Sequence, residues 1–108
     1  MRVVMVASPY RGNVEENEWY ARTACTDAVS RGELPIAPHL LFTQFLDDGD
    51  ELERDIGMNM GQHLLRHHCQ LLAVYDDNGI SDGMKAEIAL AERFGITVEY
   101  RSVANGMH

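Results

Sequence analysis

The sequence predicts a single α/β domain over residues 1–108: a Rossmann- or flavodoxin-like three-layer fold with a parallel sheet of four strands, or five. Short apolar runs alternate along the chain with longer segments of helical periodicity, and right-handed crossovers between such strands give a parallel sheet covered on both faces. A chain of 108 residues suffices for one modest core. Its 45% hydrophobic and 24% charged residues are typical of globular domains.

Four segments are predicted to be extended. Arg2–Ser8 and Gln70–Asp76 are apolar almost throughout, which is typical of strands buried on both faces. Leu34–Phe42 is extended but contains two prolines, which suit a strand end leading into a loop. Ile96–Val103 is the fourth strand, and the tail at 104–108 is expected to be loose.

Three helices are predicted between these strands. The first spans Val14–Ser30 and is capped by Asn13. The second runs over Glu51–His68, and the third over Ser81–Phe94, where Gly95 ends it. Within the second helix, these residues follow helical spacing: Leu52, Ile56, Met60, His63, Leu64 and His67.

The net charge of −8 argues against a nucleic-acid polymer as partner, because such proteins need clusters of Lys and Arg that this chain lacks. A small anionic ligand is still compatible with it. The chain has no apolar run long enough to cross a membrane and no signal-peptide pattern, so a cytoplasmic protein without a membrane partner is predicted. Cys25 and Cys69 are expected to be buried free thiols, with a disulfide between them as the alternative.

Glu87 is the most informative single residue. A helix turns about 100° per residue, and in that projection Glu87 lies near the middle of an apolar arc. Gly83 is one turn earlier on the same face, and Ser81 is a good N-cap, so free N–H groups at the helix start form an anion site close to the carboxylate. Glu87 is therefore predicted to be a nucleophile or general base in a cleft. The alternative, given equal weight, is a structural ion pair with Arg11.

Parallel α/β folds bind ligands beyond the carboxyl ends of their strands. Three stretches qualify here: SPYRGN, APHLLF and YDDNGIS. Together with PIAPHLLF, ERDIGMNMG and VYDDNGISDGMKAEI, SPYRGN resembles the nucleoside 2-deoxyribosyltransferase superfamily, and in particular its small DUF4406-like members found in phages and prophages. The resemblance runs from Val3 to about Val98, nearly the whole chain.

Its most specific motif is Ser-x-Gly-x-x-x-Glu, formed here by Ser81, Gly83 and Glu87. In the 2′-deoxynucleoside 5′-phosphate N-hydrolases, the similar serine helps to hold the 5′-phosphate and the glutamate attacks the anomeric carbon. The transferases commonly have an aspartate at the serine position, so the chain is more similar to the hydrolases. The resemblance implies double displacement at C1′ of a nucleoside or nucleotide, as in retaining glycosidases.

Further roles follow from the same resemblance. Asp55 would act as the acid or base-orienting partner, with Asp76 and Asp77 as competing candidates and Asp77 also as a ligand contact. Ser8, Arg11 and Gly12 match the family's first loop, where Arg11 could bind a phosphate. Tyr10 would orient Glu87, or would only pack over the sheet edge. His39 is a candidate to bind a phosphate or hydroxyl, or is an ordinary loop histidine.

Two differences from the motif of the N-hydrolases favour a ligand without phosphate. Asp82 and Lys85 put charges inside the motif where the hydrolases mostly carry small or apolar residues, and the segment LDDGDELERD is acidic. An exposed Asp82 at the helix start would repel a phosphate by about 1 kcal/mol. The ligand is therefore expected to be nucleoside-like more firmly than phosphorylated.

The remaining signals are weaker. His63, His67 and His68 lack a third ligand at regular spacing, so neither a metal site nor a cofactor is predicted. The methionines of GMNMG are assigned to core filling, with packing against a base or a partner subunit as the alternative, and Trp19 is assigned to the core or to an oligomer contact. Because related enzymes build their sites between subunits, a homo-oligomer is expected.

The alternative functions are a non-catalytic module that binds a nucleotide-derived ligand and a protein-interaction domain with a vestigial cleft.

Overall fold

The computed structural model describes residues 1–103, and these form one parallel four-stranded sheet with the strand order β2-β1-β3-β4. The predicted tail at 104–108 lies outside the described residues. The strands are β1 (Val3–Ala7), β2 (Leu34–Ile36), β3 (Leu71–Tyr75) and β4 (Thr97–Arg101). The helices are α1 (Val14–Ser30), α2 (Pro38–Leu41), the 3₁₀ helix η1 (Phe42–Gln44), α3 (Glu51–His68) and α4 (Asp82–Arg93). The predicted α/β class and the parallel sheet are confirmed.

The chain reverses its direction of travel across the sheet at β1. It first moves outward from β1 to β2, and then returns to the other side of β1 to add β3 and β4. In register, Val4 of β1 lies opposite Pro35 of β2 and Leu71 of β3. The space beyond the carboxyl ends of β1 and β3 is therefore the topological switch point, where open α/β sheets bind ligands.

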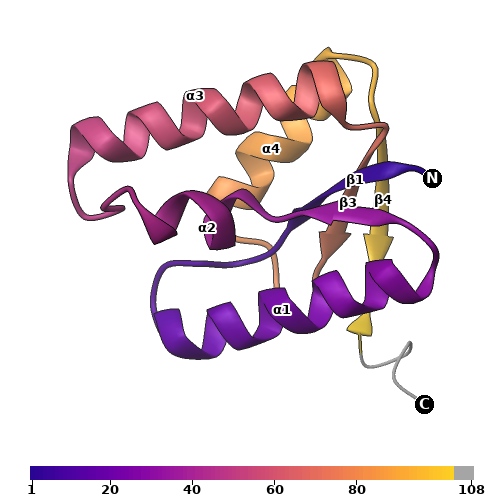
Figure 1. Ribbon diagram of the computed structural model, residues 1–108, viewed down its shortest axis with the longest axis horizontal. Helices are drawn as coiled ribbons and strands as arrows, with labels where there is room; N and C mark the ends of the chain where they lie inside the picture. The colour runs from indigo at the N-terminus through magenta and orange to yellow at the C-terminus, as the bar shows by residue number, and fades with distance from the viewer. Residues whose placement is uncertain (104–108) are drawn as a thin grey trace.

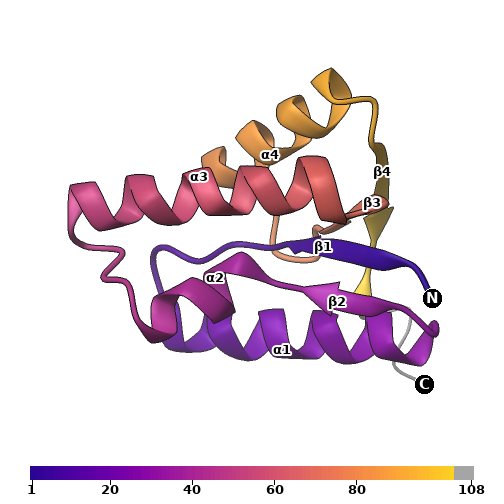
Figure 2. The same cartoon turned by 45° about the horizontal axis from the view of Figure 1, so that its top comes forward.

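Helices cover both faces of the sheet, with α1 on one face and α3 and α4 on the other (Figure 1, Figure 2). The alternation of side chains along β1 explains this arrangement. Val4 and Val6 pack with the buried residues of α1, whereas Met5 and Ala7 pack with Leu65 of α3 and with buried residues of α4. The strands are apolar throughout because both of their faces are covered.

Side chains cap three helix starts, two of them at the residues that the sequence predicted, Asn13 and Ser81, and one at Asp50, which was not predicted. The side chain of Asn13 accepts a hydrogen bond from the backbone N–H of Glu16 at the start of α1. Asp50 caps α3 by accepting from two backbone N–H groups, and Ser81 caps α4 by accepting from the N–H of Met84. α1 and α3 have their predicted bounds, and α4 lies within one residue of them at each end.

One predicted element is partly wrong. The expected extended segment Leu34–Phe42 is a strand only as far as Ile36, and the chain then forms α2 and η1. Pro38 is the first residue of α2. A proline is well suited to that position because its fixed φ matches a helix and its missing N–H would have no partner in the first turn.

The face that α3 buries also differs from its apolar pattern. Leu52 and Ile56, on the periodic stripe of the sequence, are exposed. The buried face instead contains Leu65, Gly61 and Gly57, and a Cβ at Gly61 would lie 3.7 Å from Pro38 Cβ. Small residues let α3 lie close to α2 and η1, but they contribute little to a hydrophobic pattern.

Polar residues on the α1 face form a connected network. The guanidinium of Arg101, with 1% of its side chain exposed, donates to both carboxylate oxygens of Glu33 at 2.7 and 2.8 Å. It also donates to the hydroxyl of Tyr75, which in turn donates to Asp27 at 2.8 Å. The guanidinium lowers the pKa of Glu33, and burial raises the pKa of Tyr75 to about 12. Burial by itself would lower the pKa of Arg101, but its hydrogen bonds raise that pKa overall.

Other sequence expectations meet mixed outcomes. Trp19 has 65% of its surface exposed, which excludes the core alternative, and its role in an oligomer contact stays a prediction. Both cysteines are free, with Cys69 buried and Cys25 half-buried, and burial raises the pKa of each thiol. None of the helices in residues 1–103 has the length and hydropathy that a membrane span requires.

Candidate functional site

A cleft of about 710 Å³ opens at the switch point, on the α3–α4 side of the sheet. Its walls come from the loop after β1, from α2 and η1, from one face of α3 and from the first turns of α4. The sequence-predicted residues that line it are Ser8, Tyr10, Arg11, His39, Ser81, Gly83 and Glu87. Segments that are far apart in the chain thus converge at the carboxyl ends of the strands.

Glu87 is half-buried and lines this cleft from the second turn of α4. Its carboxylate makes no hydrogen bond or ion pair with any residue that the structure describes. Burial raises the pKa of the Glu87 carboxyl from its ordinary value to about 7. Glu87 is thus a carboxylate that is poorly solvated and has no partner among the described residues. These two properties are typical of catalytic acids, bases and nucleophiles.

The alternative role for Glu87, an ion pair with Arg11, is not formed. Arg11 instead places Nε 3.4 Å from Oδ2 of Asp48, which belongs to the loop between η1 and α3. Both side chains line the cleft. Gly12 follows with φ of +101°, a conformation that side-chain-bearing residues rarely adopt, so its part in the motif is to make the turn after Arg11. Gly12 does not line the cleft.

The start of α4 forms the wall next to Glu87. The hydroxyl of Ser81 accepts from the N–H of Met84 at 3.3 Å, and its own N–H contacts the sulfur of Met84. A Cβ at Gly83 would meet only Ser81 Oγ, at 3.9 Å, so this residue leaves open space beside the helix start. The first-turn N–H groups therefore face a volume in which a polar ligand atom could lie.

Ser8 and His39 form the opposite part of the cleft. Oγ of Ser8, a residue with 6% exposure, lies 2.6 Å from Nε2 of His39. Burial lowers the pKa of His39 to about 4, so its imidazole is neutral at pH 7. The ring of Tyr10 meets that of His39 edge-on, with centroids 6.4 Å apart. The structure describes no hydrogen bond between Tyr10 and Glu87, and so the predicted orienting contact is absent there.

Two predicted site residues lie elsewhere. Asp55 is exposed on α3 and does not line the cleft. The carboxylate of Asp77 accepts hydrogen bonds from the hydroxyls of Tyr20 and Ser102 and from the N–H of Val103. Asp77 thus joins α1 to the end of β4 and is not in the cleft, and neither is its alternative, Asp76. Of the four carboxylates predicted to act in catalysis or ligand binding, Glu87, Asp55, Asp76 and Asp77, only Glu87 lines the cleft.

Residues of α3 that were not predicted occupy the place expected for Asp55. Glu53, Arg54, Met58 and Gln62 line the cleft. Met58 is 52% exposed, so core filling is wrong for this residue, and its alternative, packing against a base or a partner subunit, stays a prediction. Met58 and Arg54 lie seven and eleven residues before the buried Leu65, close to two and three full turns, so they lie on nearly the same side of the helix, whereas Asp55 is turned about 80° away from Leu65. The sequence contains this helical spacing, but the spacing identifies the cleft residues only when the buried face of α3 is known.

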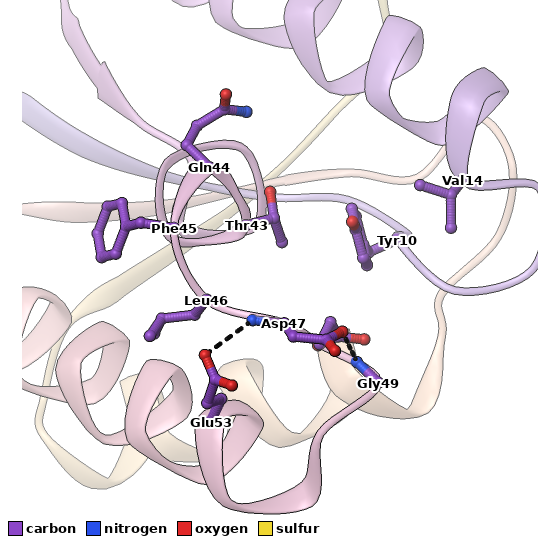
Figure 3. A pocket seen from close by; sticks show the side chains of 10 residues that line it. Tyr10, Val14, Thr43, Gln44, Phe45, Leu46, Asp47, Gly49 and Glu53 are labelled. Atoms are coloured by element: carbon purple, nitrogen blue, oxygen red, sulfur yellow. Dashed lines mark hydrogen bonds between the residues drawn. The ribbon is translucent and has the colours of Figure 1, made fainter.

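A second hollow of about 580 Å³ adjoins the cleft at the end formed by η1 and the loop before α3, here called the outer end of the cleft, and Figure 3 shows the residues that line this hollow. The two share five residues: Tyr10, Thr43, Leu46, Asp48 and Glu53. Three carboxylates line this hollow, from Asp47, Asp48 and Glu53, and none of the described residues in its lining is basic. Glu53 accepts from the N–H of Asp47, and Asp47 accepts from the N–H of Gly49, which fixes the loop (Figure 3).

No group of three or more potential ligands in residues 1–103 has the geometry to hold a metal ion. The rings of His63 and His67 on α3 are 4.7 Å apart between centroids, but both side chains are exposed and away from the cleft.

Comparison with known proteins gives a family but no activity. No curated protein matches the chain. The model of a domain of unknown function, DUF7768, matches residues 2–101, which includes the whole sheet and every cleft residue named above. The chain therefore belongs to the DUF7768 family.

Proposed function

We propose that this protein cleaves or transfers the N-glycosidic bond of a nucleoside or nucleotide, with Glu87 as the nucleophile. One observation carries the proposal: a half-buried carboxylate without a protein partner among the described residues lines a cleft of about 710 Å³. The similarity of the Ser81, Gly83 and Glu87 motif to the nucleoside 2-deoxyribosyltransferase superfamily supports the same reaction.

The chemistry needs a carboxylate on one side of the sugar and space for the base on the other. Glu87 would attack C1′ through an oxocarbenium-like transition state and form a glycosyl ester, which water or a second base then resolves. The raised pKa favours a reactive carboxylate, since the group is poorly solvated when ionised. Polar groups of Ser8 and Ser81 are available for sugar hydroxyls, and the apolar lining from Phe42 and Leu46 is available for a base.

Covalent trapping tests this role directly. Incubation with 2′-fluoro-2′-deoxynucleosides should leave a mass adduct that peptide mapping assigns to Glu87. In release assays over the common nucleosides and their 5′-monophosphates, Glu87→Gln should lower kcat/KM by about 10³-fold or more. Glu92→Gln, an exposed change on the same helix, should keep normal activity. Unchanged base release by the Glu87→Gln protein would refute the proposal.

One observation favours the alternative, a module that binds a nucleotide-derived ligand without cleaving it. Asp55, the acid implied by the family resemblance, lies outside the cleft. In such a module Glu87 would only accept hydrogen bonds from ribose hydroxyls. Tight nucleoside binding without any base release or adduct would support it, whereas the absence of binding to any nucleoside derivative would favour a protein-interaction role.

We further propose that the protein acts in the cytoplasm as a homo-oligomer. The free thiols of Cys25 and Cys69 support the compartment. The exposed apolar side chains of Phe45 and Leu52 support a subunit contact near the outer end of the cleft. Sedimentation velocity measures the oligomeric state, and Leu52→Lys should weaken a contact at this place.

A further inference from the structure

The charges around the cleft are unbalanced. Its lining includes four carboxylates, from Asp48, Glu53, Asp82 and Glu87, against the two guanidinium groups of Arg11 and Arg54. Asp82 is fully exposed and lies 4.0 Å from Lys85, so it can be set aside, and three carboxylates still face two arginines. The start of α4 adds about half a positive charge, so a small negative excess remains around the cleft when Glu87 is ionised.

The adjoining hollow extends the imbalance outward. Within residues 1–103, carboxylates are the only charged groups of its lining, and two of them, Asp48 and Glu53, belong to the cleft as well. A ligand with its sugar beside Glu87 would direct its remaining part along this acidic wall or out to solvent. A positive charge on that part would be attracted, and a negative charge would be repelled.

Among the residues that the structure describes, the cleft also has no evident acid for a leaving base. Asp48 is paired with Arg11, Glu53 accepts a hydrogen bond from the N–H of Asp47, and His39 is neutral. Asp55 and Asp77 are elsewhere. None of these groups resembles the buried carboxylic acid that protonates a leaving group in glycosidases.

We propose that the cleft selects N-glycosides whose base already carries a positive charge, such as pyridinium ribosides and N-alkylated purine nucleosides. This inference rests on the proposed function and names its substrate class. A carboxylate oxygen of Glu87 attacks C1′ while the C1′–N bond breaks, and the bonding electron pair goes to the base nitrogen. The cationic base thereby leaves as a neutral molecule and needs no proton.

The second half of the reaction consumes water. A water oxygen attacks C1′, the ester bond to Glu87 breaks, and its electron pair returns to the carboxylate. The additional proton of that water passes to solvent. A cationic substrate also favours the ionised form of the nucleophile, since a nearby positive charge opposes the effect of burial on the pKa of Glu87. An anionic 5′-phosphate would do the reverse.

Two matched ligand pairs test the inference through binding. They are nicotinamide riboside with its neutral dihydro form, and 1-methyladenosine, which is cationic at neutral pH, with adenosine. Calorimetric titration would use both the wild-type protein and Glu87→Gln, in which cleavage cannot distort the measured Kd. At an ionic strength of about 20 mM, the cationic member of each pair should bind the wild type about tenfold more tightly, and the preference should shrink at about 500 mM.

Variants that remove single charges test which side chains cause the preference for cationic ligands. Asp48→Asn and Glu53→Gln remove negative charge from the lining and should each lower the cation preference severalfold. Glu92→Gln removes a charge outside the cleft and should leave it unchanged. Equal or tighter binding of the neutral members would overturn the inference, as would a preference that Asp48→Asn and Glu53→Gln do not alter.

Product release separates this inference from the proposed function. Release of base from adenosine at least as fast as from 1-methyladenosine, after each rate is divided by the uncatalysed rate, would overturn the substrate class and leave the glycosidase function intact. Selective binding of cations with no release from any ligand would overturn the glycosidase function and support the charge selection alone. Failure of all four ligands to bind would overturn both.

Discussion

On the α1 face of the sheet, the buried charged side chains of Asp27, Glu33 and Arg101 all have partners, whereas on the α3–α4 face the half-buried Glu87 has none among the described residues. The α1 face is closed by small residues and by Tyr20 and Tyr75. The opposite face is closed only in part, because the cleft separates α2 and η1 from the start of α4.

This difference separates two uses of charge in a small domain. A buried charge costs several kcal/mol unless it is paired, so the α1 network is compensated within the fold. The Glu87 carboxylate is desolvated without such compensation, and the fold tolerates this because the group can bind a proton. The described contacts do not offset the free-energy cost of burying the Glu87 carboxylate, and a role in ligand binding or in catalysis explains why a carboxylate lies there.

The largest effect on stability is expected at Arg101. Arg101→Ala removes the partner of the buried carboxylate of Glu33 and should lower the free energy of unfolding by about 3–5 kcal/mol. Urea denaturation with a fluorescence readout measures this loss. Arg22→Ala, an exposed change on α1, should alter stability by no more than about 0.5 kcal/mol. Similar losses in the two variants would mean that the network does not contribute as described.

A smaller, pH-dependent effect is expected at Glu87. Its pKa is raised in the folded protein to about 7, so the folded state binds this proton more tightly than the unfolded state. The resulting stabilisation is fully present below the unfolded pKa and is lost as pH rises through about 7. The free energy of unfolding of Glu87→Gln minus that of the wild type should therefore increase by roughly 2–3 kcal/mol from acidic pH to above neutrality.

Urea titrations at several pH values measure this difference. Glu92→Gln, exposed on the same helix, should give a difference that does not vary with pH. A flat profile for Glu87→Gln as well would show that the carboxylate is solvated like an ordinary surface group, and the contrast between the two faces would be lost.

The smallest of these effects is expected at Ser81. Ser81→Ala removes the acceptor for the N–H of Met84 and should destabilise the protein by about 1 kcal/mol. Ser81→Asp should recover most of that stability, because an aspartate caps a helix equally well. Thermal unfolding distinguishes the two variants. Equal destabilisation by both would indicate that the serine hydroxyl matters for a reason other than capping.

Much of the site was predictable from local patterns. Ser81, Gly83 and Glu87 lie within two turns of one helix, so their shared face follows from helical geometry. Ser8, Tyr10 and Arg11 follow a strand in a parallel sheet, and such loops meet at one edge. Asp55 was predicted to lie in the cleft, but its neighbour Arg54 lines the cleft and Asp55 does not. Along a helix, one residue changes the direction of a side chain by about 100°.

The sequence by itself determined the alternation of the four strands with the three long helices, the caps at Asn13 and Ser81, and the desolvated position of Glu87, because these depend on residues close together in the chain. Only the tertiary structure decided which face of α3 is buried, that Arg11 pairs with Asp48 instead of Glu87, and that acidic side chains gather at the outer end of the cleft. Those outcomes depend on contacts between α2, η1, α3 and the loop after β1. Glycines and exposed charges carry little local signal, and the choice among such contacts is made only when the elements pack together.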